Sequence, residues 1–226
     1  MDYSHVNVKC PDDVIDGSLI TKEKRHELFG RVSGGAGSKK PEEYQRQKII
    51  DGTGFACHKT NDRINLRTHT LNNICRPNIK NDGFDYSENF DGLQIINNTN
   101  NNTKNKNNKK NTKIYINFKC ISGKGGSQTR SLREVYWFVE GQLRFLQSNE
   151  SNQFNQSNDS NESNNKNEIY FANILDGDEA NASMSKFEYI ISLPEFKNIK
   201  RKIYIGDLKG YFNWFAECIY CDCNNL

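Results

Sequence analysis

The stretch IYINFK, residues 114–119, decides the predicted fold of this chain. Its apolar residues are typical of a buried strand, yet it ends on a lysine and carries an asparagine two positions earlier. Side chains two apart on a strand share a face, so we expect Asn117 and Lys119 to point the same way. Because a charged side chain in a buried strand is costly unless it has a role, Lys119 is the first candidate for function.

The segments around this stretch predict a mixed α/β domain. Residues 84–96 and 113–121 alternate well enough to form a hairpin whose tip is an Asn-rich tract. From Leu132 to Leu146 the apolar residues recur with helical spacing, which predicts a buried helix. Further strands are predicted over 169–175 and 202–207, and further helices over 21–29, 41–50, 185–193 and 210–219. This order indicates a mixed central β-sheet flanked by helices, in one domain over residues 1–226.

Two low-complexity tracts lower the hydropathy of the chain. Mean hydropathy is −0.86, but residues 97–112 and 148–168 consist largely of Asn, Ser and Lys. Such segments cannot bury enough apolar surface to fold, so we interpret both as solvated insertions or disordered loops. The remainder has ordinary globular composition, and the net charge of +3 permits an anionic partner without requiring one.

Cysteine usage indicates the compartment. The chain has seven cysteines, an odd number, with no secretory signal and no membrane-spanning run. We therefore expect free thiols in a reducing intracellular compartment, cytoplasm or nucleus, and no membrane partner. Asn-rich tracts are typical of AT-rich genomes, which suggests a protist or a giant virus, in the latter case acting in the host cell or the virion.

A structural zinc site is an alternative use of the cysteines and histidines. Two groups carry candidate ligands: Cys57, His58, His69 and Cys75, and the C-terminal Cys218, Cys221 and Cys223. Two ligands are adjacent in the first group and a fourth ligand is missing from the second, so free cysteines are the default interpretation.

A carboxylate lies within reach of the lysine. If the strand over 84–96 pairs with the strand over 113–121, Asp91 reaches the face of Lys119. A carboxylate there can hold Mg²⁺, which prefers oxygen ligands and keeps several waters. The lysine can orient or deprotonate an attacking water and offset phosphate charge, while the metal stabilises the pentacovalent phosphate.

This order of parts resembles the PD-(D/E)xK nuclease superfamily, and type II restriction endonucleases in particular. The resemblance covers Phe84 to Gly210, interrupted by the two tracts, with Asp91 at the family's first acid and Lys119 at its lysine. It implies a restriction-endonuclease-like core, Mg²⁺-dependent cleavage of double-stranded DNA at specific sites, and a symmetric homodimer.

The chain departs from the family's pattern at one position. The second acid would stand at residue 117, where this chain has asparagine. In some restriction enzymes the following helix supplies that acid, so Glu134 is the expected substitute and, with Asp91, the expected metal ligand. Otherwise Asn117 ligates through its carbonyl, Glu88 serves instead, or the site is inactive.

Ordinary structural roles remain open for the same residues. Asp91-Gly92 can be a simple turn pair, and Lys119 can be an edge-strand lysine that blocks aggregation. Glu134 has Arg130 four residues earlier, and a solvated helix pair accounts for it.

Basic residues suggest where DNA would bind. The candidates for contact are Arg63 and Arg67 in a polar stretch, and Lys124, Arg130 and Arg133 beside the predicted site. The alternative for the first stretch is a solvated surface loop. The predicted function is a Mg²⁺-dependent, site-specific endonuclease, and the alternatives are a catalytically inactive DNA-binding protein on a nuclease fold and a zinc-stabilised interaction protein.

Overall fold

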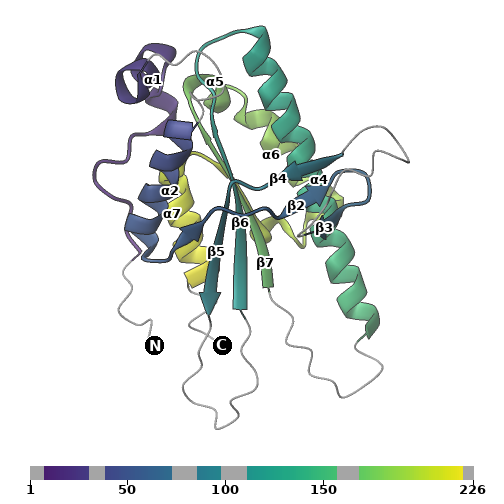
Figure 1. Ribbon diagram of the computed structural model, residues 1–226. Helices are drawn as coiled ribbons and strands as arrows, with labels where there is room; N and C mark the ends of the chain where they lie inside the picture. Colours follow the sequence, from purple (N-terminus) through teal and green to yellow (C-terminus); the bar gives the residue numbers. More distant parts are fainter. Residues whose placement is uncertain (1–7, 31–38, 73–85, 98–110, 157–167, 221–226) are drawn as a thin grey trace.

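A five-stranded mixed sheet forms the centre of the protein in the computed structural model, which describes residues 8–30, 39–72, 86–97, 111–156 and 168–220 (Figure 1). The strand order is β1-β5-β6-β7-β8. The strands are β1 (Cys57–His58), β5 (Gly92–Asn97), β6 (Asn111–Cys120), β7 (Glu168–Asp176) and β8 (Ile203–Gly206). Helices cover both faces, which confirms the predicted α/β class with a mixed sheet flanked by helices.

The chain connections set the directions of the strands. Strands β5 and β6 pair antiparallel from Gly92 opposite Ile116 to Asn97 opposite Asn111, as the predicted hairpin requires. Helix α4 (Gly126–Gln156) then carries the chain back, so β7 pairs parallel to β6. Strand β8 is parallel to β7. Both β6 and β7 read as near-continuous apolar runs because both of their faces are buried.

Each face of the sheet packs against its own helical layer. On one face Tyr115 and Phe171 pack with the apolar residues of α4 and of α6 (Met184–Ser192). On the other, Ile114 and Phe118 pack with α2 (Lys39–Thr53) and α7 (Leu208–Trp214). Figure 1 shows these pairs of helices on opposite sides of the strands. The remaining helical elements are η2 (Gly17–Leu19), α1 (Lys22–Phe29), α5 (Asp178–Asn181), η4 (Pro194–Phe196), η5 (Lys200–Lys202) and the π-helix η6 (Phe215–Tyr220).

A small second sheet changes one prediction. Its order is β3-β2-β4, formed by β2 (Arg63–Asn65), β3 (Thr70–Asn72) and β4 (Ser87–Asn89). The predicted strand over 84–96 therefore divides between two sheets, β4 in the small one and β5 in the large one. Phe90, between them, is buried against the rings of Tyr115, Phe138 and Phe171. Burial of this ring bends the chain and leaves Asp91 at the point where it changes sheet.

The second Asn-rich tract is partly helical. Helix α4 continues to Gln156, so the first residues of the 148–168 tract extend it rather than forming a loop. The Ser148 and Ser151 hydroxyls donate to carbonyls four residues earlier, and Glu150 pairs with Lys202 at 3.0 Å. Residues 98–110 and 157–167 of the two tracts lie outside the described residues. Of the described helices, none is both long and apolar enough to cross a membrane.

Candidate functional site

Asp91 lies beside the carboxyl end of β6. Its backbone N–H donates to the Ile116 carbonyl at 2.9 Å, which extends the β5–β6 ladder by one bond. Its carboxylate Oδ2 accepts from the Phe118 backbone N–H at 2.8 Å. A Cβ on the next residue, Gly92, would crowd the Cys57 sulfur and the Phe118 ring. Asp91 is therefore held beside the end of β6 by hydrogen bonds of both its backbone and its side chain. The side-chain bond is to Phe118, the residue before Lys119, so Asp91 is not simply a turn residue.

Helix α2 is fastened over this end of the sheet by two polar side chains. Gln45 Nε2 donates to Asp176 Oδ2 at 2.6 Å and lies 3.4 Å from the Lys119 carbonyl. Arg46 Nη2 donates to the Asp91 carbonyl at 2.7 Å, and its guanidinium lies 5.4 Å from the centre of the Phe118 ring. These contacts fix the first turn of α2 close to the ends of β5 and β6.

Glu42 occupies that first turn, one helical turn before Arg46. Burial raises the pKa of its carboxyl, and the negative charge of Asp91 raises it further, while Lys119 and Arg46 oppose the change. A carboxylate whose proton affinity is raised by a second carboxylate is in a place that favours a cation. Glu42 and Asp91 are thus electrostatically coupled although they come from a helix and from the start of a strand.

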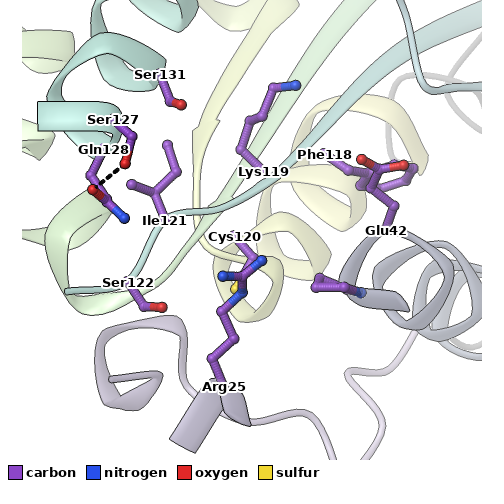
Figure 2. A pocket seen from close by; sticks show the side chains of 11 residues that line it. Arg25, Glu42, Phe118, Lys119, Cys120, Ile121, Ser122, Ser127, Gln128 and Ser131 are labelled. Atoms are coloured by element: carbon purple, nitrogen blue, oxygen red, sulfur yellow. Dashed lines mark hydrogen bonds between the residues drawn. The ribbon is translucent and has the colours of Figure 1, made fainter. Parts of the chain in front are cut away.

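Lys119 completes the group. Together with Glu42 it lines a cavity of about 270 Å³ between the beginnings of α2 and α4. Figure 2 shows both side chains at this cavity, and they come from different sides of it. Neither Lys119 nor Glu42 forms a hydrogen bond or an ion pair through its side chain with any described residue, and Asp91 Oδ1 accepts none. Half-buried charges that the fold leaves unpaired are available to a ligand.

Asn117 shares a side of β6 with Lys119 but is used differently. It is 2% exposed, and its Nδ2 donates to Asn173 Oδ1 at 3.3 Å. Asn173 in turn donates to Gln142 of α4 at 2.7 Å. The structure therefore places the Asn117 amide in a buried network between the sheet and α4, rather than among the residues that line the cavity.

The other predicted acids lie away from the cavity. Glu134 is exposed on α4, while the residues of this helix that line the cavity are Ser127, Gln128 and Ser131. No ion pair joins Glu134 to Arg130 among the described residues. Glu88 is exposed in β4, opposite Ile64 of the small sheet. The structure places the Asp91 carboxylate on the backbone N–H of Phe118, the residue before Lys119, and the acid that shares the cavity with Lys119 is Glu42.

The predicted DNA-contacting residues fall into two groups. Lys124, Arg130 and Arg133 are exposed in the loop before α4 and in its first turns, but none of them lines the cavity, and Arg133 lines a separate hollow between α4 and α6. Arg63 and Arg67 belong to the small-sheet region instead, where the Arg67 guanidinium lies 5.5 Å from the centre of the Tyr86 ring. Neither group lines the cavity, and contact with DNA stays a prediction for both.

The cysteine and histidine groups form no metal centre within the described part of the chain. There, no three His, Cys, Asp or Glu side chains lie close enough together to hold a metal ion. Cys75, Cys221 and Cys223 lie outside the described residues. Burial raises the pKa of the Cys57 thiol to about 11 and that of Cys120 to about 12, so both are protonated at neutral pH.

The residues at the cavity nevertheless fit a magnesium ion. Mg²⁺ is commonly held by one or two carboxylates, with waters and substrate oxygens as its other ligands. Glu42 lines the cavity; Asp91 does not, but it lies near enough to act on the charge of Glu42, and its Oδ1 accepts no hydrogen bond from the described residues, so the two residues supply two such oxygens. A third protein carboxylate is not needed for this kind of site.

Glu42 is the candidate site residue that the sequence pattern did not reveal. An acidic residue in the first turn of a helix is common because it complements the helix dipole, so Glu42 carries no distinguishing signal. It lies far from Asp91 and Lys119 in sequence, and only the packing of α2 on the sheet joins them. Comparison of the chain with protein-family models, curated proteins and solved structures found no match, so the site rests on geometry alone.

Proposed function

We propose that this protein is a Mg²⁺-dependent endonuclease that hydrolyses phosphodiester bonds of double-stranded DNA, on a restriction-endonuclease-like core. One observation carries the proposal. The Lys119 ammonium, without an ion-pair partner among the described residues, shares a cavity with the Glu42 carboxylate and lies one residue from the backbone N–H that holds the Asp91 carboxylate. Two acids and a lysine in this arrangement suit metal-assisted attack on a phosphate.

The topology supports the same assignment. An acid precedes β5, the lysine ends the antiparallel neighbour β6, and a helix then crosses to the parallel strand β7. This is the order of parts on which the resemblance to restriction endonucleases rests. Glu42 takes the place of the missing second acid, which was expected at Asn117 or Glu134.

The chemistry follows from the three side chains. Mg²⁺, when bound, supplies a Lewis acid that stabilises charge on the phosphate and on the leaving oxygen. Glu42 and Asp91, in their ionised carboxylate forms, would hold that ion. Lys119 would orient the attacking water and offset the charge that develops on phosphorus oxygens. The attacking water gives up a proton to solvent and its oxygen bonds to phosphorus, while the phosphorus–ester oxygen bond breaks and the leaving oxygen takes up a proton from solvent.

A cleavage assay with matched variants tests the proposal. Purified protein is incubated with phage DNA of known sequence in Mg²⁺ or in EDTA, and discrete fragments are expected only in Mg²⁺. Glu42→Gln and Lys119→Met should each lower the cleavage rate by about a hundredfold or more. Glu134→Gln should retain the wild-type rate. Full activity in Glu42→Gln would show that Glu42 is not part of the active site. Loss of activity in Glu134→Gln but not in Glu42→Gln would show that Glu134 is the second acid, as the sequence predicted.

A catalytically inactive DNA-binding protein is the second candidate. The observation that favours it is Asn117, which stands where the family's second acid is expected and is engaged by Asn173. In that case DNA would be retarded in a gel but left intact in Mg²⁺. The resemblance also implies a homodimer, and sedimentation of the protein with and without a palindromic duplex would measure this.

A further inference from the structure

The end of the cavity away from Glu42 carries polar groups that the proposed metal site does not use. Ser122, just after β6, lines this end and is only 4% exposed. Its hydroxyl has no hydrogen-bond partner among the residues that the structure describes. Burial of an unpaired hydroxyl is unfavourable, so the position is explained best if a ligand supplies the missing partner.

Arg25 of α1 lines the same end of the cavity. Its Nε is buried and also lacks a hydrogen-bond partner within the described part of the chain. Figure 2 shows the Arg25 guanidinium beside Cys120, with Ser122 at the same end of the cavity and the Lys119 ammonium farther along it. An arginine with a free N–H beside an unpaired hydroxyl presents donors in a geometry suited to an oxyanion.

The other lining residues add donors and little negative charge. Helix α4 contributes Ser127, Gln128 and Ser131 from its first turns. Of the residues that line the cavity, Glu42 is the single acid, and it stands on the α2 side. The charges in the cavity are therefore separated: the Glu42 carboxylate stands at one side, and Arg25, Lys119 and the serine hydroxyls line the remainder.

We propose that the Arg25–Ser122 end of this cavity binds a phosphate group, which in the endonuclease of the preceding section is a substrate phosphate adjacent to the one that is cleaved. A phosphate has enough oxygens to accept from Arg25 and Ser122 together. The identification of the phosphate as part of DNA rests on the proposed function. The binding of phosphate itself does not, because it needs neither Mg²⁺ nor Glu42.

Inorganic phosphate is the first probe. Its affinity for the full-length protein is measured by isothermal titration calorimetry in EDTA at constant ionic strength. Arg25→Gln should weaken binding by about tenfold to a hundredfold, and Ser122→Ala by about threefold to tenfold. Arg201→Gln removes an exposed arginine outside the cavity and should leave the affinity unchanged. Unchanged affinity in Ser122→Ala with a native melting temperature, or no saturable binding by the wild type, would overturn the proposal.

Short DNA duplexes then identify the source of the phosphate. Duplexes with a 5′-phosphate or a 5′-hydroxyl are compared in EDTA with the wild type and Arg25→Gln. A preference for the 5′-phosphate that Arg25→Gln abolishes assigns a terminal phosphate. If the wild type binds the two duplexes equally and Arg25→Gln weakens the binding of both, the bound group is an internal phosphate. Equal affinity of wild type and variant for both duplexes would contradict a role in substrate binding.

The two proposals fail in different ways. If the wild type binds phosphate through Arg25 but never cleaves DNA in Mg²⁺, the proposed endonuclease is wrong and the phosphate site stands. If Glu42→Gln abolishes cleavage while Arg25→Gln and Ser122→Ala leave phosphate and DNA binding unchanged, the endonuclease stands and the phosphate site is wrong.

Discussion

Replacement of Asp176 by asparagine should change how the stability of the protein depends on pH. Asp176 ends β7 and is 2% exposed. Its Oδ1 accepts from the Leu208 backbone N–H at 3.0 Å, and its Oδ2 accepts from Gln45. Burial raises the pKa of the carboxyl from 3.8 to about 6, with Asp207 and Asp16 acting in the same direction. The residue fastens α2 and α7 to the sheet, so its titration is felt in the fold that positions the candidate site.

The sign and size of the effect follow from the two pKa values. The folded protein holds this proton up to pH about 6, whereas the unfolded chain loses it near 3.8. Stability from the protonated carboxyl is therefore fully present below pH 3.8 and is lost as the pH rises through about 6. At 1.36 kcal/mol for each pH unit, the loss amounts to about 3 kcal/mol of unfolding free energy.

Urea unfolding of wild type and Asp176→Asn between pH 4 and 8 measures this term. The difference in unfolding free energy between the two proteins should shift in favour of the variant by about 3 kcal/mol across pH 4 to 6.5 and then stay level. Asp12→Asn, on the exposed surface, sets the baseline for the loss of one aspartate. Parallel pH curves for wild type and Asp176→Asn would show that the carboxyl is already ionised in the fold, and would refute the reasoning.

Three further changes test the packing around the site. Gly177→Ala should lower the free energy of unfolding, measured by urea denaturation, by about 3 kcal/mol or more, because φ is +116° and a Cβ would collide with the Ile121 carbonyl. The control is Gly126→Ala, where a Cβ meets nothing within 4 Å, and it should change the free energy of unfolding by less than about 1 kcal/mol. Similar effects for both variants would contradict the steric reason. Asn173→Ala should lower the free energy of unfolding by about 2–4 kcal/mol in the same assay, because it leaves the buried amides of Asn117 and Gln142 without this partner. A loss below about 1 kcal/mol would mean that this hydrogen-bond network contributes little to stability. Alkylation of Cys120 by iodoacetamide at pH 8 should be about a thousandfold slower in the folded protein than in the urea-unfolded chain, because the thiolate is the reactive form and burial raises the pKa of this thiol from 9.0 to about 12. Peptide mapping by mass spectrometry measures both rates. Rates within tenfold of each other would indicate an exposed thiol.

The secondary structure was largely predictable because its signals are local. Helical spacing from Leu132 to Leu146 predicted the core of α4, and the β5–β6 hairpin followed from alternation alone. The division of the 84–96 strand could not be predicted in this way. It depends on the burial of Phe90 against rings from β6, β7 and α4, which are distant in the chain.

The candidate site was only half predictable. Asp91 directly precedes β5 and Lys119 lies near the end of β6, and the hairpin brings these two ends together, so local pairing was enough to place them near each other. Asn117 could not be separated from Lys119 by strand alternation, because both point to the same side. Its engagement by Asn173 depends on the register of β6 with β7 across the α4 crossover.

The sequence by itself determined the order of strands and helices, the antiparallel start and parallel continuation of the sheet, and the placement of an aspartate beside a lysine. These depend on periodicity and on connection length, which are read along the chain. Only the tertiary structure decided that Glu42, rather than Glu134, shares the cavity with Lys119, and that Arg25 and Ser122 form its opposite end. The reason is physical: a cavity is bounded by whichever elements pack around it, and the packing of α1 and α2 over the end of β6 depends on long-range contacts such as those of Gln45 and Arg46.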